Sequence, residues 1–184
     1  NEYRYFDIKS IKHQTELVKR IDYVIPNYNV YLYPSENREF KPYFYSKDFN
    51  GKYYIALQEG HKPDIESDYV YVYFTLPSDQ IIIEGEMYIS GGLNNWNFDK
   101  NNLMKYNPER REYECTMLLK QGWYNYEFVF AKNGVPDRSA TLFEGSHYET
   151  ENDYIVLVYY RNPRDRYDRI IGSVIANTLN RLTN

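Results

Sequence analysis

The chain has 184 residues, of which 42% are apolar and 23 are tyrosine, with a formal net charge of −4. This composition supports a packed core rather than disorder, and the acidic balance excludes the basic footprint that nucleic-acid binding requires. No apolar run approaches the roughly 20 residues of a membrane helix, so no membrane span is expected. Tyrosine favours strands with aromatic faces, which predicts an all-β protein.

Strand-like runs separated by polar breaks fill the first 60 residues. YRYFDIKS and YNVYLYPS are aromatic and β-branched, as strands are. FKPYFYSKDFNGKYYIAL predicts a hairpin, because Asn50-Gly51 is a favoured pair for a type I′ turn. HKPDIESD carries proline and charge, and is interpreted as a linker. We therefore expect a β-rich module over residues 1–66, which needs upstream strands to be complete.

Short strands with turn signals between them predict an antiparallel β-sandwich over residues 67–163. YVYVYFTLP places Val70, Val72 and Phe74 on one face, and EYECTMLL and YNYEFVF alternate in the same way. GEMYISGGLNNW is expected to be a strand that ends in a glycine-rich corner. Asn133-Gly134 is a second turn signal, and NDYIVLVYYR is expected to close the sandwich. Residues 164–184 form a tail in which Ile171, Ile175 and Leu179 fit a helical stripe, while the β-branched content also fits a strand.

Residues that could carry chemistry do not form a recognised pattern. Cys115 is the only cysteine, which excludes a disulfide framework, and its alternating neighbours predict a buried small hydrophobe. The acidic residues around His147 lack the alternating ligand spacing of a calcium loop, so a solvated loop is the preferred interpretation; they are Glu144, Glu149, Glu151 and Asp153. His13, His61 and His147 have no serine or cysteine signature nearby. We expect no catalytic residue, no metal and no cofactor.

Two tryptophans are candidates for a binding surface. Trp96, with Asn94 and Asn95 before it, could stack on a sugar ring and bond its hydroxyl groups, and Trp123 could add a second platform. The competing interpretation is structural, with Trp96 capping the core at a corner of the sandwich and Trp123 starting a strand. The structural interpretation is favoured.

Residues 85–134 resemble the early-set sandwich of glycogen- and starch-binding domains. The resemblance rests on GGLNNW, EYECTMLL and QGWYNYEFVFAKNG, and it implies an immunoglobulin-like fold for the second module. Sugar binders of this kind carry a lysine where this chain has Glu127, and a further tryptophan just past the turn, where it reads Val135-Pro136-Asp137-Arg138. The resemblance therefore implies the fold more strongly than it implies a glycan ligand.

A longer resemblance covers essentially the whole chain. NEYRYFDIKS, YNVYLYPSENREFKPYFYSKDFNGKYYI, DYVYVYFTLP, EGSHYETENDYIVLVYYR and RYDRIIG occur in this order in the C-terminal part of the type IX secretion system plug proteins of Bacteroidota, which the chain resembles. This implies a non-enzymatic periplasmic protein, associated with the outer membrane, that closes a translocon β-barrel. It also implies an export signal in an upstream part. A carbohydrate-binding module that holds a glycan through Trp96 is the alternative function.

Overall fold

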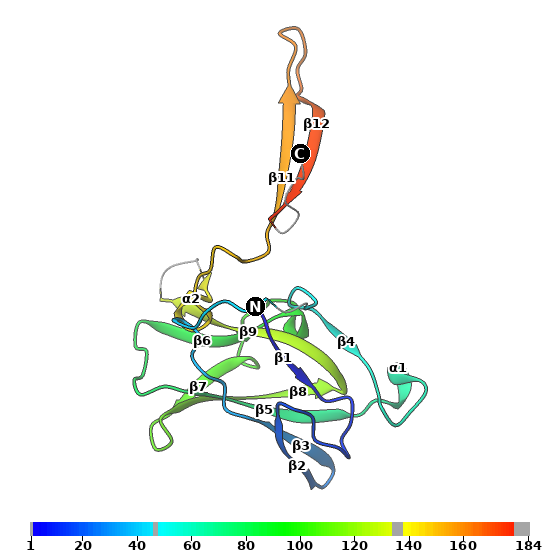
Figure 1. The fold of residues 1–184 in the computed structure, drawn as a ribbon, viewed down its shortest axis with the longest axis vertical. Coiled ribbons are helices and arrows are strands. Elements are labelled where there is room, and N and C mark those ends of the chain that lie inside the picture. The colour runs from blue at the N-terminus through cyan, green and yellow to red at the C-terminus, as the bar shows by residue number, and fades with distance from the viewer. Residues whose placement is uncertain (1, 46–47, 134–137, 179–184) are drawn as a thin grey trace. The chain divides into compact units, whose positions relative to one another are not determined.

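The computed structural model describes residues 2–45, 48–133 and 138–178, and almost all of its regular elements are strands (Figure 1). The expected all-β fold is confirmed at this level. Contacts divide the chain into two compact units, Asn1–Ser146 (unit 1) and His147–Asn184 (unit 2). Within the described residues, no helix has both the length and the apolar character needed to cross a membrane.

Unit 1 is built on one large hydrogen-bonded sheet. Its strands follow the spatial order β1-β9-β6-β7-β8-β5-β3-β2, and β4 and β10 also pair with β9. Three short helical elements, η1 (Gly92–Asn94), α1 (Pro63–Glu66) and α2 (Thr141–Glu144), lie in the connections. The strands are β1 (Arg4–Asp7), β2 (Val18–Val24), β3 (Asn27–Leu32), β4 (Tyr53–Ile55), β5 (Tyr69–Pro77), β6 (Gly85–Ser90), β7 (Leu103–Asn107), β8 (Glu112–Lys120), β9 (Gly122–Lys132) and β10 (Arg138–Ser139).

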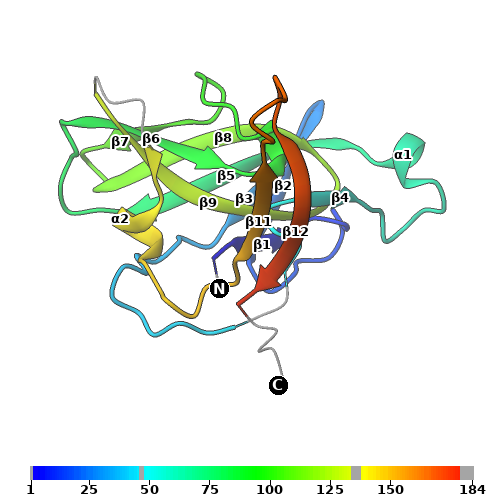
Figure 2. The same cartoon turned by 90° about the horizontal axis from the view of Figure 1, so that it is seen from above.

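The sheet curves so that β1 and β9 face β5 across an aromatic core (Figure 1). The ring of Phe74 on β5 meets Phe6 on β1 at 5.4 Å between centroids, and Tyr126 on β9 at 5.3 Å. Figure 2 shows β8, β5 and β3 side by side in the other half of the sheet. Edge-to-face aromatic packing of this kind fixes how the two halves lie on each other.

Side-chain alternation places the expected residues in this core. On β5, Val70, Val72 and Phe74 are buried, whereas Tyr69 is exposed. On β8, Tyr113, Cys115, Met117 and Leu119 are buried in the same alternating manner. These strands were predicted from their period of two, and they are confirmed. The strand β2 lies in the region expected to be strand-rich, but its run was not singled out in the sequence. The parallel pairing of β3 with β5 departs from the expected antiparallel arrangement.

The Asn50-Gly51 turn forms, but the predicted hairpin around it is wrong. Both residues have positive φ, 50° and 76°, and the Lys52 N–H donates to the Phe49 carbonyl at 3.1 Å. The strand after the turn, β4, pairs with β9 instead of with the segment before the turn. The reason is that β9 is longer than β6. The first residues of β9 extend past the end of β6, and their free edge pairs with β4.

The division into units differs from the expected modules. Residues 1–66 supply β1 to β4 to the same sheet as β5 to β9, and β3 pairs with β5 across the expected boundary at residue 66. The expected linker contains the short helix α1. Strand pairing between segments distant in sequence thus puts residues 1–66 in the same sheet as β5 to β9, although the composition had suggested separate modules.

Unit 2 contains an antiparallel hairpin of β11 (Asp153–Tyr160) and β12 (Arg169–Asn177). The run expected to close the sandwich is therefore paired with the tail, in a sheet of its own. The tail adopts the strand alternative, which its β-branched residues favour. Leu179 of the helical stripe, like Gly134 of the second turn signal, lies outside the described residues.

Candidate binding surfaces

The GGLNNWNF corner is held together by the side chain of Asn94. Its amide nitrogen donates to the carbonyls of Ile89, at 3.0 Å, and Asn97, at 2.8 Å, and its oxygen accepts from the Gly91 N–H at 3.2 Å. Asn102 donates to the same two carbonyls. The hydrogen-bonding groups of Asn94 are thus occupied by the turn, and a sugar hydroxyl would have to displace them.

Asn95 and Trp96 follow in the left-handed conformation, each with φ of 53°. The Trp96 N–H donates to the Gly91 carbonyl at 3.0 Å, so its backbone belongs to the turn. Its ring is 42% exposed, which makes it a surface side chain rather than a core plug. The backbone of this corner is structural, while the ring remains accessible.

Trp123 belongs to a different surface, on the outer face of β1, β9 and β4. Its ring stacks between Tyr5, at 5.8 Å, and Tyr54, at 6.0 Å, and meets the edge of Phe49 at 4.9 Å. Tyr5, Tyr54 and Phe49 are 37%, 39% and 51% exposed. We call Tyr5, Trp123, Tyr54 and Phe49 the aromatic row. Within the described residues, no ring contact joins it to Trp96.

Buried polar contacts fix the aromatic row in place. The buried amide of Asn125 accepts from the Phe49 N–H at 2.8 Å and donates to the Arg4 carbonyl at 3.1 Å, which ties the Phe49 segment to β1. The Tyr5 hydroxyl donates to Glu16 at 3.1 Å. Because the rings face each other, they offer mainly edges and hydroxyl groups to solvent. This suits a flat protein contact better than face-on stacking of a sugar.

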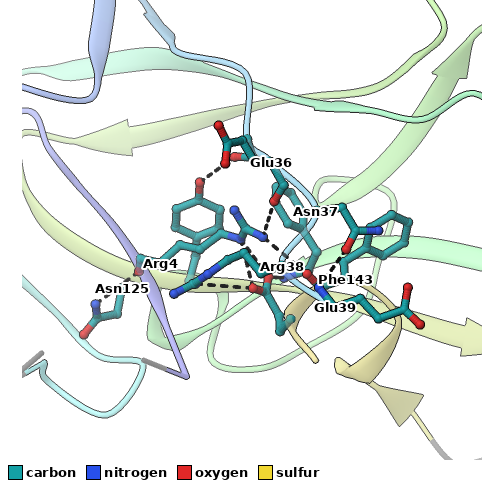
Figure 3. Close-up of polar contacts among 11 residues, drawn as sticks. Arg4, Glu36, Asn37, Arg38, Glu39, Asn125 and Phe143 are labelled. Atoms are coloured by element: carbon teal, nitrogen blue, oxygen red, sulfur yellow. Dashed lines mark hydrogen bonds and ion pairs between the residues drawn. The ribbon is translucent and has the colours of Figure 1, made fainter. Parts of the chain in front are cut away.

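A buried ion pair links β1 to α2. The Glu144 carboxylate, at the end of α2, accepts from Arg4 Nε at 2.8 Å and from Arg38 at 3.4 Å. It also accepts from the backbone N–H of Phe128 on β9, at 3.0 Å. Figure 3 shows Arg4 and Arg38 together near Phe143. Glu144 thus bonds a β9 amide in the interval between β1 and β10.

A cavity of about 580 Å³ opens next to Arg4. Residues from β1 and from the segment after β3 form most of its wall, together with Tyr126 on β9. Its charged groups are all paired: Arg4 and Arg38 with Glu144, and Lys41 with Glu36. The remaining lining residues are Tyr3, Tyr5, Leu17, Leu32, Tyr33, Pro34, Ser35, Phe44 and Tyr126.

Glu127, which stands where the sugar binders resembled in sequence carry lysine, is half-buried on β9. Burial and, to a smaller extent, the nearby carboxylate of Glu144 together raise the pKa of its carboxyl to about 7. A group that is half neutral at pH 7 cannot replace a lysine as a cationic donor. Above its pKa the half-buried carboxylate is charged, and this charge lowers the stability of the fold.

The cysteine and most of the acidic residues singled out in the sequence are buried or hydrogen-bonded within the fold. Cys115 is buried, and burial raises the pKa of its thiol to about 12, which disfavours the thiolate. Across residues 2–45, 48–133 and 138–178, no three His, Cys, Asp or Glu side chains gather as metal ligands would. In the acidic cluster, Glu144 pairs with Arg4, while Glu151 and Asp153 accept from the Asn177 amide.

Sequence reasoning selected Trp123 but missed the rest of the aromatic row. The signal was present in YRYFDIKS and GKYYIAL, where Tyr5 and Tyr54 are one residue out of phase with the inward-facing Phe6 and Ile55. Knowing that β1 and β4 flank the same end of β9 was needed to join them, and sequence spacing does not supply that.

No protein-family model matches this chain, and no curated protein matches it. A solved structure does: the crystal structure of a hypothetical protein from Parabacteroides merdae has 38% sequence identity and a TM-score of 0.82. The match covers 96% of this chain and 44% of that one. The two share their fold over nearly all of this chain, which spans less than half the length of the solved protein.

Proposed function

We propose that this chain is a binding subunit, without catalytic activity, that closes the periplasmic mouth of an outer-membrane secretion translocon of the type IX kind. In this proposal unit 1 is an early-set, immunoglobulin-like β-sandwich. It acts as a rigid body seated against the barrel, at the outer membrane. The sequence resemblance to plug proteins motivates the proposal, and the similar protein from Parabacteroides, a genus of Bacteroidota, is consistent with it.

The observation that carries the proposal is the aromatic row. Tyrosine and tryptophan concentrate binding energy at protein interfaces, because a large ring is buried while a polar tip tolerates water. Here three rings are already stacked across β1, β9 and β4, so little side-chain entropy remains to be lost on binding. The row would therefore be the contact surface for the barrel.

The test is capture of the barrel by the immobilised protein from a detergent extract of Bacteroidota outer membranes, with identification by mass. Wild type is expected to retain one very large β-barrel protein. Tyr54→Ser should lower its recovery at least about tenfold, since an interface anchor contributes roughly 2 kcal/mol or more. Tyr69→Ser, at an exposed tyrosine on β5 in the same unit, is the matched control. Equal recovery by the two variants would remove the row from the proposal, and no barrel with wild type would refute the function.

The exposed ring of Trp96 favours a second candidate, a carbohydrate-binding module. In that function Trp96 and Asn95 would hold a glycan, with Asn94 shaping the corner. Titration with soluble α-glucans, followed by tryptophan fluorescence, separates the two. Saturable binding to the wild type that is lost in the Trp96→Ala variant, in which Trp123 is kept, would support the glycan function in place of the plug function.

A further inference from the structure

The hairpin of unit 2 is apolar on both of its faces. One face carries Tyr154, Val156 and Val158 on β11, with Val174 and Ala176 opposite on β12. The other face carries Ile155, Leu157 and Tyr159, with Ile175 and Ile170 opposite. All the large apolar side chains of the two strands are between 44% and 67% exposed. In the described residues, each of the two strands pairs only with the other, which leaves both outer edges open.

This pattern is that of strands in the interior of a layered structure. An antiparallel pair with one wet face alternates apolar and polar residues, whereas strands covered on both faces read as continuous apolar runs. A two-stranded hairpin is also marginally stable by itself and needs further strands or a covering layer. The apolar sequence of β11, DYIVLVYY, therefore indicates that other residues pack against both faces of the hairpin.

A second copy of the hairpin does not meet this requirement. Two hairpins stacked face to face would bury one apolar face of each and leave the other face in water. Two hairpins joined edge to edge would bury neither face. The cover must come from at least two layers, or from one sheet that the hairpin joins and a layer on its far side.

We propose that β11 and β12 are two strands of a second β-module, whose remaining strands come from residues of the same protein outside these 184. The similar Parabacteroides chain is long enough to contain such a module. More than half of that chain lies beyond the match, while the match covers 96% of this chain. The two open edges would pair with strands of that module, and its core would cover the two apolar faces. This inference stands independently of the proposed secretion function.

Amide hydrogen exchange tests the proposal directly. Deuterium uptake over residues 153–160 and 169–177 is compared between the 184-residue chain and the product of the complete gene. We expect these amides to exchange at least on the order of 100-fold more slowly in the longer protein, since they join a cooperative core there. Peptides from β5 and β8 report that unit 1 is folded in both samples.

Lysine substitutions then probe the two faces separately, in the longer protein. Val156→Lys and Ile155→Lys, on opposite faces, should each abolish the added protection, whereas Tyr148→Lys, at a 92% exposed residue of unit 2, should not. Equal protection in both proteins, or sensitivity on one face only, would overturn the proposal. So would a complete gene that adds no β-module, or protection of the 184-residue chain that grows with its concentration.

Discussion

At the scale of single residues, Glu127 makes stability depend on pH. Burial raises its pKa from 4.5 to about 7 in the folded chain. Between these values the folded chain keeps a proton that the unfolded chain has lost. The stabilising contribution is therefore complete below pH 4.5, and declines as the pH rises to about 7.

Glu127→Gln should remove this dependence and raise the free energy of unfolding at pH 8 by about 1–3 kcal/mol, after allowance for partial solvent screening. Urea denaturation of variant and wild type from pH 4.5 to 8 measures the difference. Glu109→Gln, at an exposed glutamate, is the control. A constant difference between Glu127→Gln and wild type across this range would contradict the assignment.

At the scale of elements, β9 is completed by a side chain where it lacks a neighbouring strand. Between the part of β9 that pairs with β1 and the part that pairs with β10, the Phe128 N–H donates to Glu144. The same carboxylate neutralises Arg4, whose side chain is only 10% exposed. One residue of α2 thus satisfies a strand amide and a buried cation together.

Glu144→Ala should cost about 3–5 kcal/mol of unfolding free energy, because it leaves the Arg4 guanidinium buried without its partner. Glu144→Gln should cost less, since its amide oxygen still accepts from Phe128. Chemical denaturation gives both values, and the glutamine variant provides a reading even if the alanine variant does not fold. A loss below about 1 kcal/mol for Glu144→Ala would show that water replaces the carboxylate.

At the scale of the whole molecule, the sheet of unit 1 depends on strands from the first 66 residues. A fragment of residues 67–146 lacks β1, β3 and β4, and so loses the partners of β5 and of the first part of β9. We expect this fragment to lack the near-ultraviolet circular dichroism and cooperative unfolding of residues 1–146. A cooperative transition in the shorter fragment would instead support the module boundary expected from composition.

The sequence predicted strands well and their partners poorly. Alternation identified β5, β8 and β9, because inward side chains repeat every two residues whatever the partner strand is. It did not identify β4 as a neighbour of β9, or β3 as a parallel neighbour of β5, because pairing depends on edges that are free only in the folded chain. For the same reason Trp123 was found without Tyr5 and Tyr54, and the apolar run of β11 was placed in the wrong sheet.

The pairing of β1 with β9 also bears on how the protein acquires its structure. Arg4 meets Tyr126, so the first strand has no place in the sheet until most of unit 1 has been synthesised. Contacts this distant in sequence slow folding, because a long loop must close before any of them forms. A chain whose sheet depends on such distant pairings stays unfolded for longer after synthesis than one whose strands pair with near neighbours in sequence.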